Sequence, residues 1–147
     1  MQISGGPSGL PRALLDTGAL LALVDVRERL HAACAEALQH LRLPLTTTSA
    51  VLAETFHFAL RRYDLRQLTW DFIREGGAVL APITGADLPA LETLMDRYAD
   101  RPMDFADATL VHVAEREGLK TILTTDRSDF ETYRIGRSAK FRILPAR

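Results

Sequence analysis

The chain has a single cysteine, no long apolar run and almost no net charge, and each of these absences excludes a class of protein. Cys34 alone can build neither a disulfide framework nor a multi-cysteine zinc site within one chain, so we expect a reduced, cytoplasmic setting. No apolar stretch approaches the ~20 residues that a membrane helix needs, so we expect no contact with a membrane. The net charge of −1 gives no overall field that would attract nucleic acid.

The size and composition are those of one soluble globular domain. The chain has 147 residues, of which 47% are apolar and 25% charged, enough to bury a continuous core. We expect a single domain over residues 12–147. Residues 1–11 contain two adjacent glycines and two prolines and lack the apolar region of a signal peptide, so they predict a flexible N-terminal lead.

Positive charge is concentrated near the C-terminus. From residue 127 to 147, six basic residues face two acidic ones, an excess of four positive charges. The basic residues are Arg127, Arg134, Arg137, Lys140, Arg142 and Arg147, and the acidic ones are Asp129 and Glu131. Two interpretations stay open here: contact with phosphates, and ordinary solvated surface charge.

Short apolar runs alternate with helical patterns along the chain. We expect strands over residues 12–15, 43–48, 78–83, 120–124 and 141–144. We expect helices over residues 18–24, 31–41, 49–62, 65–75, 84–98 and 105–117, with Ser49 as the N-cap of the third and Thr84 or Asp87 as the cap of the fifth. Strands that alternate with helices predict an α/β fold with a mostly parallel sheet covered on both faces.

Residues 103–111 are the most informative stretch, because two acids lie three residues apart where a helix should begin. Asp104 and Asp107 share a helical stripe with Val111 and Ala114, which should face a core. Capping explains the pair by itself, with Asp104 as N-cap and Asp107 at the third helical position. An N-cap carboxylate accepts a backbone hydrogen bond, whereas Asp107 is free to project, so we predict Asp107 as the functional member of the pair.

Two further acids directly follow predicted strands. Asp16 comes after the first strand and Asp126 after the strand at 120–124. In open α/β sheets the functional crevice lies outside the carboxyl ends of the strands, which makes both acids candidates. Each also has a structural interpretation, a helix N-cap for Asp16 and an Asx turn for Asp126.

Glu54 interrupts a face that otherwise looks apolar. It has Val51 three residues before it and Phe58 four residues after it, with no Lys or Arg on the same stripe. A carboxylate in such a place is normally paired or bound to a metal. We therefore expect its partner to come from elsewhere in the fold, either a distant Arg or a cation shared with other acids.

The acids can converge at one end of the sheet. The expected set is Asp16, Glu54, Asp107 and Asp126, with Asp104 and Asp129 close by. Clustered carboxylates repel one another unless a cation compensates, and an oxygen-only cluster suits Mg²⁺ or Mn²⁺. Such a site supports attack of metal-activated water on a phosphodiester.

Four segments that carry these acids resemble a known family, the PIN-domain ribonucleases, and within it the VapC-type toxins of toxin–antitoxin pairs. The matching segments are LLDTGALLAL (14–23), SAVLAE (49–54), MDFADATL (103–110) and ILTTDRSDF (122–130). The resemblance implies an α/β/α sandwich, a divalent-metal site at the four acids, endonucleolytic cleavage of RNA, a homodimer and inhibition by a small antitoxin. It also implies supporting roles for Thr17 and Thr125, which neighbour the acids.

The sequence also allows two rival interpretations. The pairs Glu28/His31 and Glu54/His57 both have the Glu-x-x-His spacing of di-iron helix bundles, but the strand-like runs argue against a bundle. The other rival is a non-catalytic PIN-like module that only binds RNA or protein. Such a module has no need for four acids, and all four are present.

Overall fold

The computed structural model describes residues 9–146, so residue 147 and most of the predicted N-terminal lead, residues 1–8, lie outside it. Its central feature is a parallel sheet in the order β3-β2-β1-β4-β7. The strands are β1 (Arg12–Leu15), β2 (Arg42–Thr47), β3 (Ala78–Leu80), β4 (Thr121–Leu123) and β7 (Arg142–Leu144). The predicted α/β class with a parallel sheet is confirmed.

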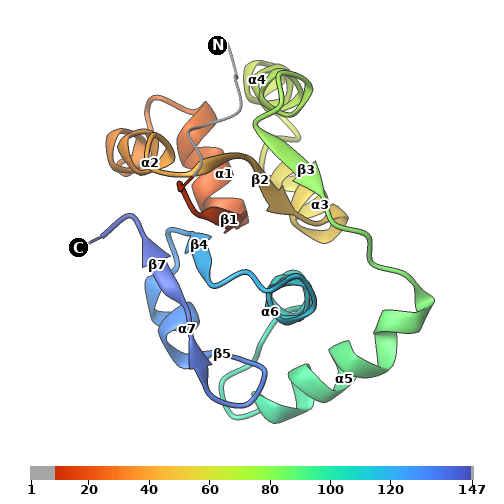
Figure 1. The fold of residues 1–147 in the computed structure, drawn as a ribbon. Coiled ribbons are helices and arrows are strands. Elements are labelled where there is room, and N and C mark those ends of the chain that lie inside the picture. Colours follow the sequence, from red (N-terminus) through yellow and green to blue (C-terminus); the bar gives the residue numbers. More distant parts are fainter. Residues whose placement is uncertain (1–8, 147) are drawn as a thin grey trace.

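Helices cover both faces of this sheet (Figure 1). Within the described range they are α1 (Thr17–Val24), α2 (His31–Leu38), α3 (Ser49–Phe58), α4 (Tyr63–Arg74), α5 (Leu88–Arg97), α6 (Phe105–Glu117) and α7 (Arg127–Thr132). Because side chains alternate along a strand, Leu14 packs into the core formed with α5, α6 and α7, while Leu15 packs into the core formed with α1 and α2. The two layers and the sheet between them make an α/β/α sandwich.

The parallel register brings several loops to one edge of the sheet. β1 pairs with β2 on one side and β4 on the other, with Leu15 opposite Leu123. The carboxyl ends of these strands therefore meet, and their next residues are Asp16, Thr48 and Thr124. α3 follows β2 and α6 precedes β4, and both helices begin at this same edge. Their first turns therefore lie beside the three residues.

The start of α6 is as predicted. Asp104 is the N-cap, and its Oδ1 accepts a hydrogen bond of 2.8 Å from the backbone N–H of Asp107. Val111 and Ala114 are buried on the stripe below Asp107. The helix ends at Gly118, whose φ of 69° lies in the left-handed region that glycine adopts without a steric penalty.

The predicted start and length of α3 are wrong. Thr48, not Ser49, is the N-cap: its backbone is extended, and its Oγ1 accepts a hydrogen bond of 3.4 Å from the N–H of Val51. The Thr48 hydroxyl also bonds to the Thr109 hydroxyl at 2.8 Å, which ties the start of α3 to α6. The helix ends at Phe58 rather than near residue 62.

Four small elements were not predicted. α7 follows β4 directly, and the hairpin of β5 (Arg134–Ile135) and β6 (Ala139–Lys140) comes before β7. A 3-10 turn (Gly85–Asp87) precedes α5, and Thr84 caps that turn instead of the α-helix. Among the described residues, no helix is both long and apolar enough to cross a membrane.

Candidate active site

A cleft of about 260 Å³ opens at the carboxyl edge of the sheet, and all four predicted acids line it. They are Asp16, Glu54, Asp107 and Asp126, and the lining also includes Asp104, Thr17 and Thr125. The sequence-based expectation that these acids converge agrees with the geometry. Asp129 is the one predicted supporting residue that is not part of the lining.

Asp16 is held rigidly at the end of β1. Its Oδ1 accepts a hydrogen bond of 2.7 Å from the N–H of Thr17, and its Oδ2 accepts one of 2.8 Å from the Thr124 hydroxyl. The side chain is only 6% exposed. Burial, and to a smaller extent the charges of Glu54 and Asp104, raise the pKa of Asp16 to about 6 although both hydrogen bonds oppose this.

Asp107 lies on the other side of the cleft, in the first turn of α6. It is 8% exposed, and its Oδ2 accepts a hydrogen bond of 2.9 Å from the hydroxyl of Tyr133. Burial raises the pKa of Asp107 to about 8, with further contributions from the charges of Asp16 and Asp104. The same burial, together with Asp107, raises the pKa of Tyr133, so this phenol stays a hydrogen-bond donor.

Asp126 lines the cleft, as expected, but its structural role differs from the Asx turn that the sequence suggested. It is the N-cap of α7, where its Oδ1 accepts a hydrogen bond of 3.4 Å from the N–H of Asp129, three residues on. Burial and the neighbouring Asp129 raise the pKa of Asp126. Asp129 itself forms an ion pair of 3.1 Å with Arg101, which holds its carboxylate at the margin of the site.

Glu54 reaches the cleft from α3, and only one of its two expected apolar neighbours is buried. Val51 lies in the core, but Phe58 is 62% exposed, so the stripe that carries Glu54 leaves the core at Glu54 and faces the cleft and solvent. Glu54 is half-buried and has no hydrogen bond or ion pair of its side chain with any residue in the range 9–146. Its charge contributes to the raised pKa of Asp16.

Three functional partners could not be identified in the sequence. Thr124 donates to Asp16, Tyr133 donates to Asp107 and Arg101 pairs with Asp129. Thr124 adjoins the predicted Thr125, but sequence alone could not tell which of two neighbouring threonines faces the acid. No motif or spacing in the sequence indicated Tyr133 or Arg101, because only the folded chain brings these two residues to the site.

The chemistry of the donors fits a hard divalent cation. The lining acids supply only oxygen ligands, which Mg²⁺ and Mn²⁺ prefer, and burial together with like charge raises the pKa of Asp16 and Asp107. A bound cation would relieve that repulsion. In the described part of the chain, no three His, Cys, Asp or Glu side chains are grouped closely enough to hold an ion as they stand.

The di-iron interpretation is excluded by the architecture. The parallel sheet takes the place of the bundle that such a centre needs. His31 is 2.7 Å from the backbone oxygen of Ala22 through its Nδ1, and Glu28 and His57 are exposed.

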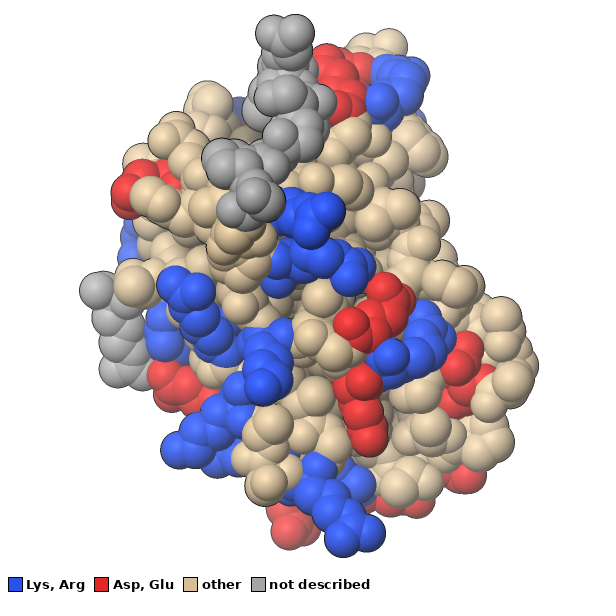
Figure 2. Space-filling view, in the orientation of Figure 1, with Lys and Arg blue, Asp and Glu red and all other residues tan. Residues whose placement is uncertain are grey.

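The two ends of the sheet carry opposite charge. Exposed basic residues gather at or near the starts of the strands, namely Arg12, Arg42, Lys120, Lys140 and Arg142. Figure 2 shows a band of Lys and Arg from the centre of this view toward the lower left. Of the C-terminal basic residues, Arg127 and Arg134 instead donate to backbone oxygens around α7, so part of that positive charge is structural.

The fold and the cleft define a class of protein, an α/β/α sandwich with an acidic site at the carboxyl edge of a five-stranded parallel sheet. The chain belongs to the PIN-domain family, whose sequence profile matches residues 13–135. It is 32% identical over 135 residues to Ribonuclease VapC26 from Mycobacterium tuberculosis, covering 90% of this chain and 99% of that protein. The resemblance to VapC-type PIN domains is thereby confirmed.

Solved structures give the same fold. VapC20 from Mycobacterium tuberculosis, a toxin that cleaves the sarcin–ricin loop, superposes with a TM-score of 0.67 at 21% identity and covers 80% of this chain and 93% of its own. PAE2754 from Pyrobaculum aerophilum superposes with a TM-score of 0.54 at 17% identity over 94% of this chain and 93% of its own. At these identities the likeness concerns the fold alone.

Proposed function

We propose that this PIN domain is an endoribonuclease that depends on Mg²⁺ or Mn²⁺ and acts as the toxin of a type II toxin–antitoxin pair. The observation that carries the proposal is the convergence of Asp16, Glu54, Asp107 and Asp126 on one cleft. The similarity to Ribonuclease VapC26, which extends over most of the chain, supports RNA as the substrate. With RNA as substrate and an antitoxin as partner, the cytoplasm is the expected place of action.

The chain's own residues prepare the cleft for such a reaction. Asp16 and Asp107 would be the principal ligands, because both are buried and each is fixed by a donor, Thr124 and Tyr133. Glu54 and Asp126 complete the oxygen donors. When bound, the cation supplies a Lewis acid for the phosphodiester and lowers the pKa of a water molecule.

The supporting residues act by holding the ligands. The Oδ1 of Asp104 accepts a hydrogen bond from the N–H of Asp107 and thereby fixes the first turn of α6. Thr17 donates its N–H to Asp16, and its hydroxyl lies 3.5 Å from the backbone oxygen of Val51 in α3. Thr125 forms the rim of the cleft, and Asp129 adds negative charge from beyond it.

The antitoxin proposal rests on a groove beside the cleft. This groove, of about 590 Å³, shares Glu54 and Asp104 with the cleft and is otherwise lined by small or apolar residues such as Ala53 and Phe105. Phe105 is 44% exposed and Phe58 62%, so apolar surface remains open near the acids. A small partner could cover this surface and set a basic side chain against the carboxylates. We further propose a homodimer, as the family resemblance implies.

Asp126→Asn tests the catalytic proposal against a module that only binds. Cleavage of RNA by the purified protein should be lost in this variant while RNA binding is retained, because one ligand oxygen loses its charge. If the wild-type protein binds RNA but does not cut it with either metal, the non-catalytic interpretation is correct. The toxin proposal is tested separately: co-expression with the product of the neighbouring short reading frame should restore growth, and failure to bind it would refute that part alone.

A further inference from the structure

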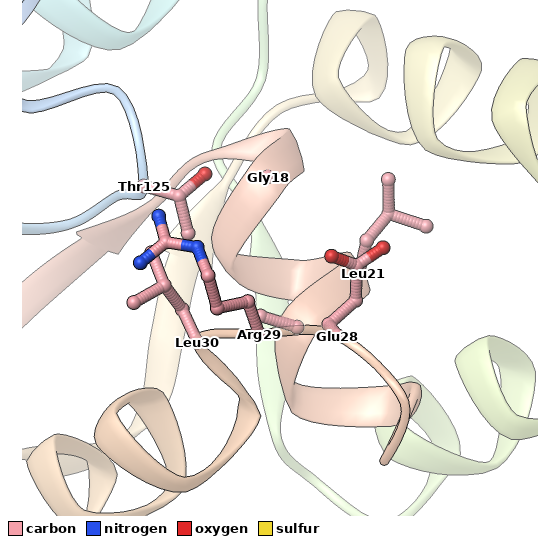
Figure 3. A pocket seen from close by; sticks show the side chains of 7 residues that line it. Gly18, Leu21, Glu28, Arg29, Leu30 and Thr125 are labelled. Atoms are coloured by element: carbon pink, nitrogen blue, oxygen red, sulfur yellow. The ribbon is translucent and has the colours of Figure 1, made fainter.

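A second pocket adjoins the acidic cleft and has a different character. It has a volume of about 270 Å³ and is lined by Gly18, Leu21, Glu28, Arg29, Leu30 and Thr125 (Figure 3). Three of these residues, Gly18, Leu21 and Thr125, also line the cleft with the acids. The two spaces therefore share one wall, and a ligand that lies in the cleft can extend into the pocket.

The shared wall is narrow because residue 18 is glycine. A Cβ placed on Gly18 would lie 2.0 Å from the Oγ1 of Thr125, a distance that no real contact tolerates. The absence of a side chain lets the end of β4 approach α1 closely. Thr125, Gly18 and Leu21 then lie between the acids and the pocket.

The pocket carries one cationic and one anionic side chain on apolar walls. In Figure 3 the Arg29 guanidinium extends toward Thr125, and the Glu28 carboxylate lies beside Leu21. Within residues 9–146, neither side chain has a hydrogen bond or ion pair. By contrast, Arg27 in the same loop is paired with Asp25 at 3.1 Å. The pocket thus offers hydrogen-bond donors from Arg29 and acceptors from Glu28, in a space that Leu21 and Leu30 also line.

We propose that this pocket receives a nucleobase flanking the scissile phosphate, with guanine preferred; the proposal rests on the proposed function. Sequence-specific proteins read single-stranded RNA by splaying bases into pockets and bonding to their edges. Guanine presents two acceptors, O6 and N7, which suit the guanidinium of Arg29. Its N1–H and amino group are donors on another edge, which suit the carboxylate of Glu28. Leu21 and Leu30 would contact the ring faces.

The test begins with a cleaved sequence found by sequencing the ends of RNA fragments. That site is rebuilt in a short RNA, and each base flanking the cut is replaced in turn by the other bases or by an abasic residue. At one flanking position, loss of guanine should lower kcat/KM on the order of 10- to 100-fold, the discrimination of one bidentate contact. Arg29→Ala should lower kcat/KM for the guanine substrate by the same factor. For the abasic substrate, Arg29→Ala and the wild type should have the same kcat/KM. Arg27→Ala, which removes the same charge from the same loop, should behave as the wild type.

The outcomes separate the pocket from the nuclease activity. If the wild type cuts all flanking bases equally, or if Arg29→Ala slows guanine and abasic substrates alike, the pocket does not read a base. If Arg29→Ala leaves base preference intact but weakens inhibition by the antitoxin, the pocket belongs to that protein partner. A metal-free arm uses guanosine monophosphate in excess chelator and follows the methyl resonances of Leu21 and Leu30. If these methyl resonances shift but the protein cuts no RNA when metal is supplied, the nuclease proposal is refuted. The proposal that the pocket binds a guanine base would then still stand.

Discussion

At the scale of single residues, Asp104 and Asp107 divide two tasks that look equivalent in the sequence. Asp104 is exposed and caps α6, whereas Asp107 is buried and faces the cleft. Helix geometry alone allowed this assignment, because an N-cap carboxylate is committed to the backbone. The capping half of the prediction is confirmed, and the role of Asp107 as ligand stays a prediction.

The two variants should therefore fail differently. Asp107→Asn should lose nearly all cleavage without any loss of stability, since it removes charge from a repelling group. Asp104→Ala should lose about 0.5–2 kcal/mol of unfolding free energy and only part of its activity, recoverable with more metal. Thermal melts and cleavage rates at several metal concentrations measure both. An inactive Asp104→Ala beside an active Asp107→Asn would reverse the roles.

Asp107 also predicts a pH dependence for the stability of the metal-free protein. Its pKa rises from an ordinary 3.8 to about 8 on folding, so the folded state holds the proton more tightly than the unfolded state. The resulting stabilisation is complete below the unfolded pKa and is lost as the pH rises through the folded one. Melting temperatures in chelator should fall between about pH 4 and pH 8, more steeply in the wild type than in Asp107→Asn. If the melting temperatures of both proteins fall with pH at the same rate, Asp107 is not the group responsible.

Tyr133 is predicted to position Asp107 rather than to touch the substrate. Tyr133→Phe removes the hydroxyl that bonds to Oδ2 at 2.9 Å. Loss of such a partner typically weakens metal affinity or activity about 10–100-fold. Cleavage should recover when more Mg²⁺ or Mn²⁺ is added. Tyr98→Phe is the control, because Tyr98 packs against Tyr133 with ring centroids 5.1 Å apart but bonds to the backbone of Arg134. Equal losses in both variants would point to a packing defect.

At the scale of elements, the long periodic segments were predictable and the short ones were not. The start of α6 and its end at Gly118 followed from residue chemistry, as did the buried run of β4. α7 has six residues and the β5–β6 hairpin has two per strand, too few to show a period. Their positions depend on contacts such as the packing of Phe130 against Phe141, which no local pattern reveals.

The cap of α3 shows how a tertiary contact overrides a local preference. Thr48 and Ser49 are both good N-caps, but only Thr48 can also bond to Thr109 in α6. Thr48→Ala should lower the unfolding free energy by about 0.5–2 kcal/mol, and Thr48→Ser should retain most of it. Denaturant titration compares the two. A serine variant as unstable as the alanine variant would show that packing of the methyl group, not the hydroxyl, matters here.

At the scale of the whole molecule, chain topology explains why the acids were easier to predict than their partners. The carboxyl ends of parallel strands must meet, so the convergence of Asp16 and Asp126 follows from the order of strands and helices along the chain. Their donors come from the same edge or from distant segments, and nothing in the sequence identified Tyr133 or Arg101. The opposite, basic end of the sheet was visible only as an excess of charge near the C-terminus.

The central claim is that the acidic cleft cuts RNA with a divalent cation, and RNA cleavage by the purified protein with and without chelator tests it most directly. Wild-type protein should cut in Mg²⁺ or Mn²⁺, stop in excess EDTA and resume when the metal is restored. Asp16→Asn, checked for a folded state by its thermal melt, should stay inactive under all three conditions. Undiminished cleavage in excess EDTA, or cleavage by folded Asp16→Asn at the wild-type rate, would contradict the account.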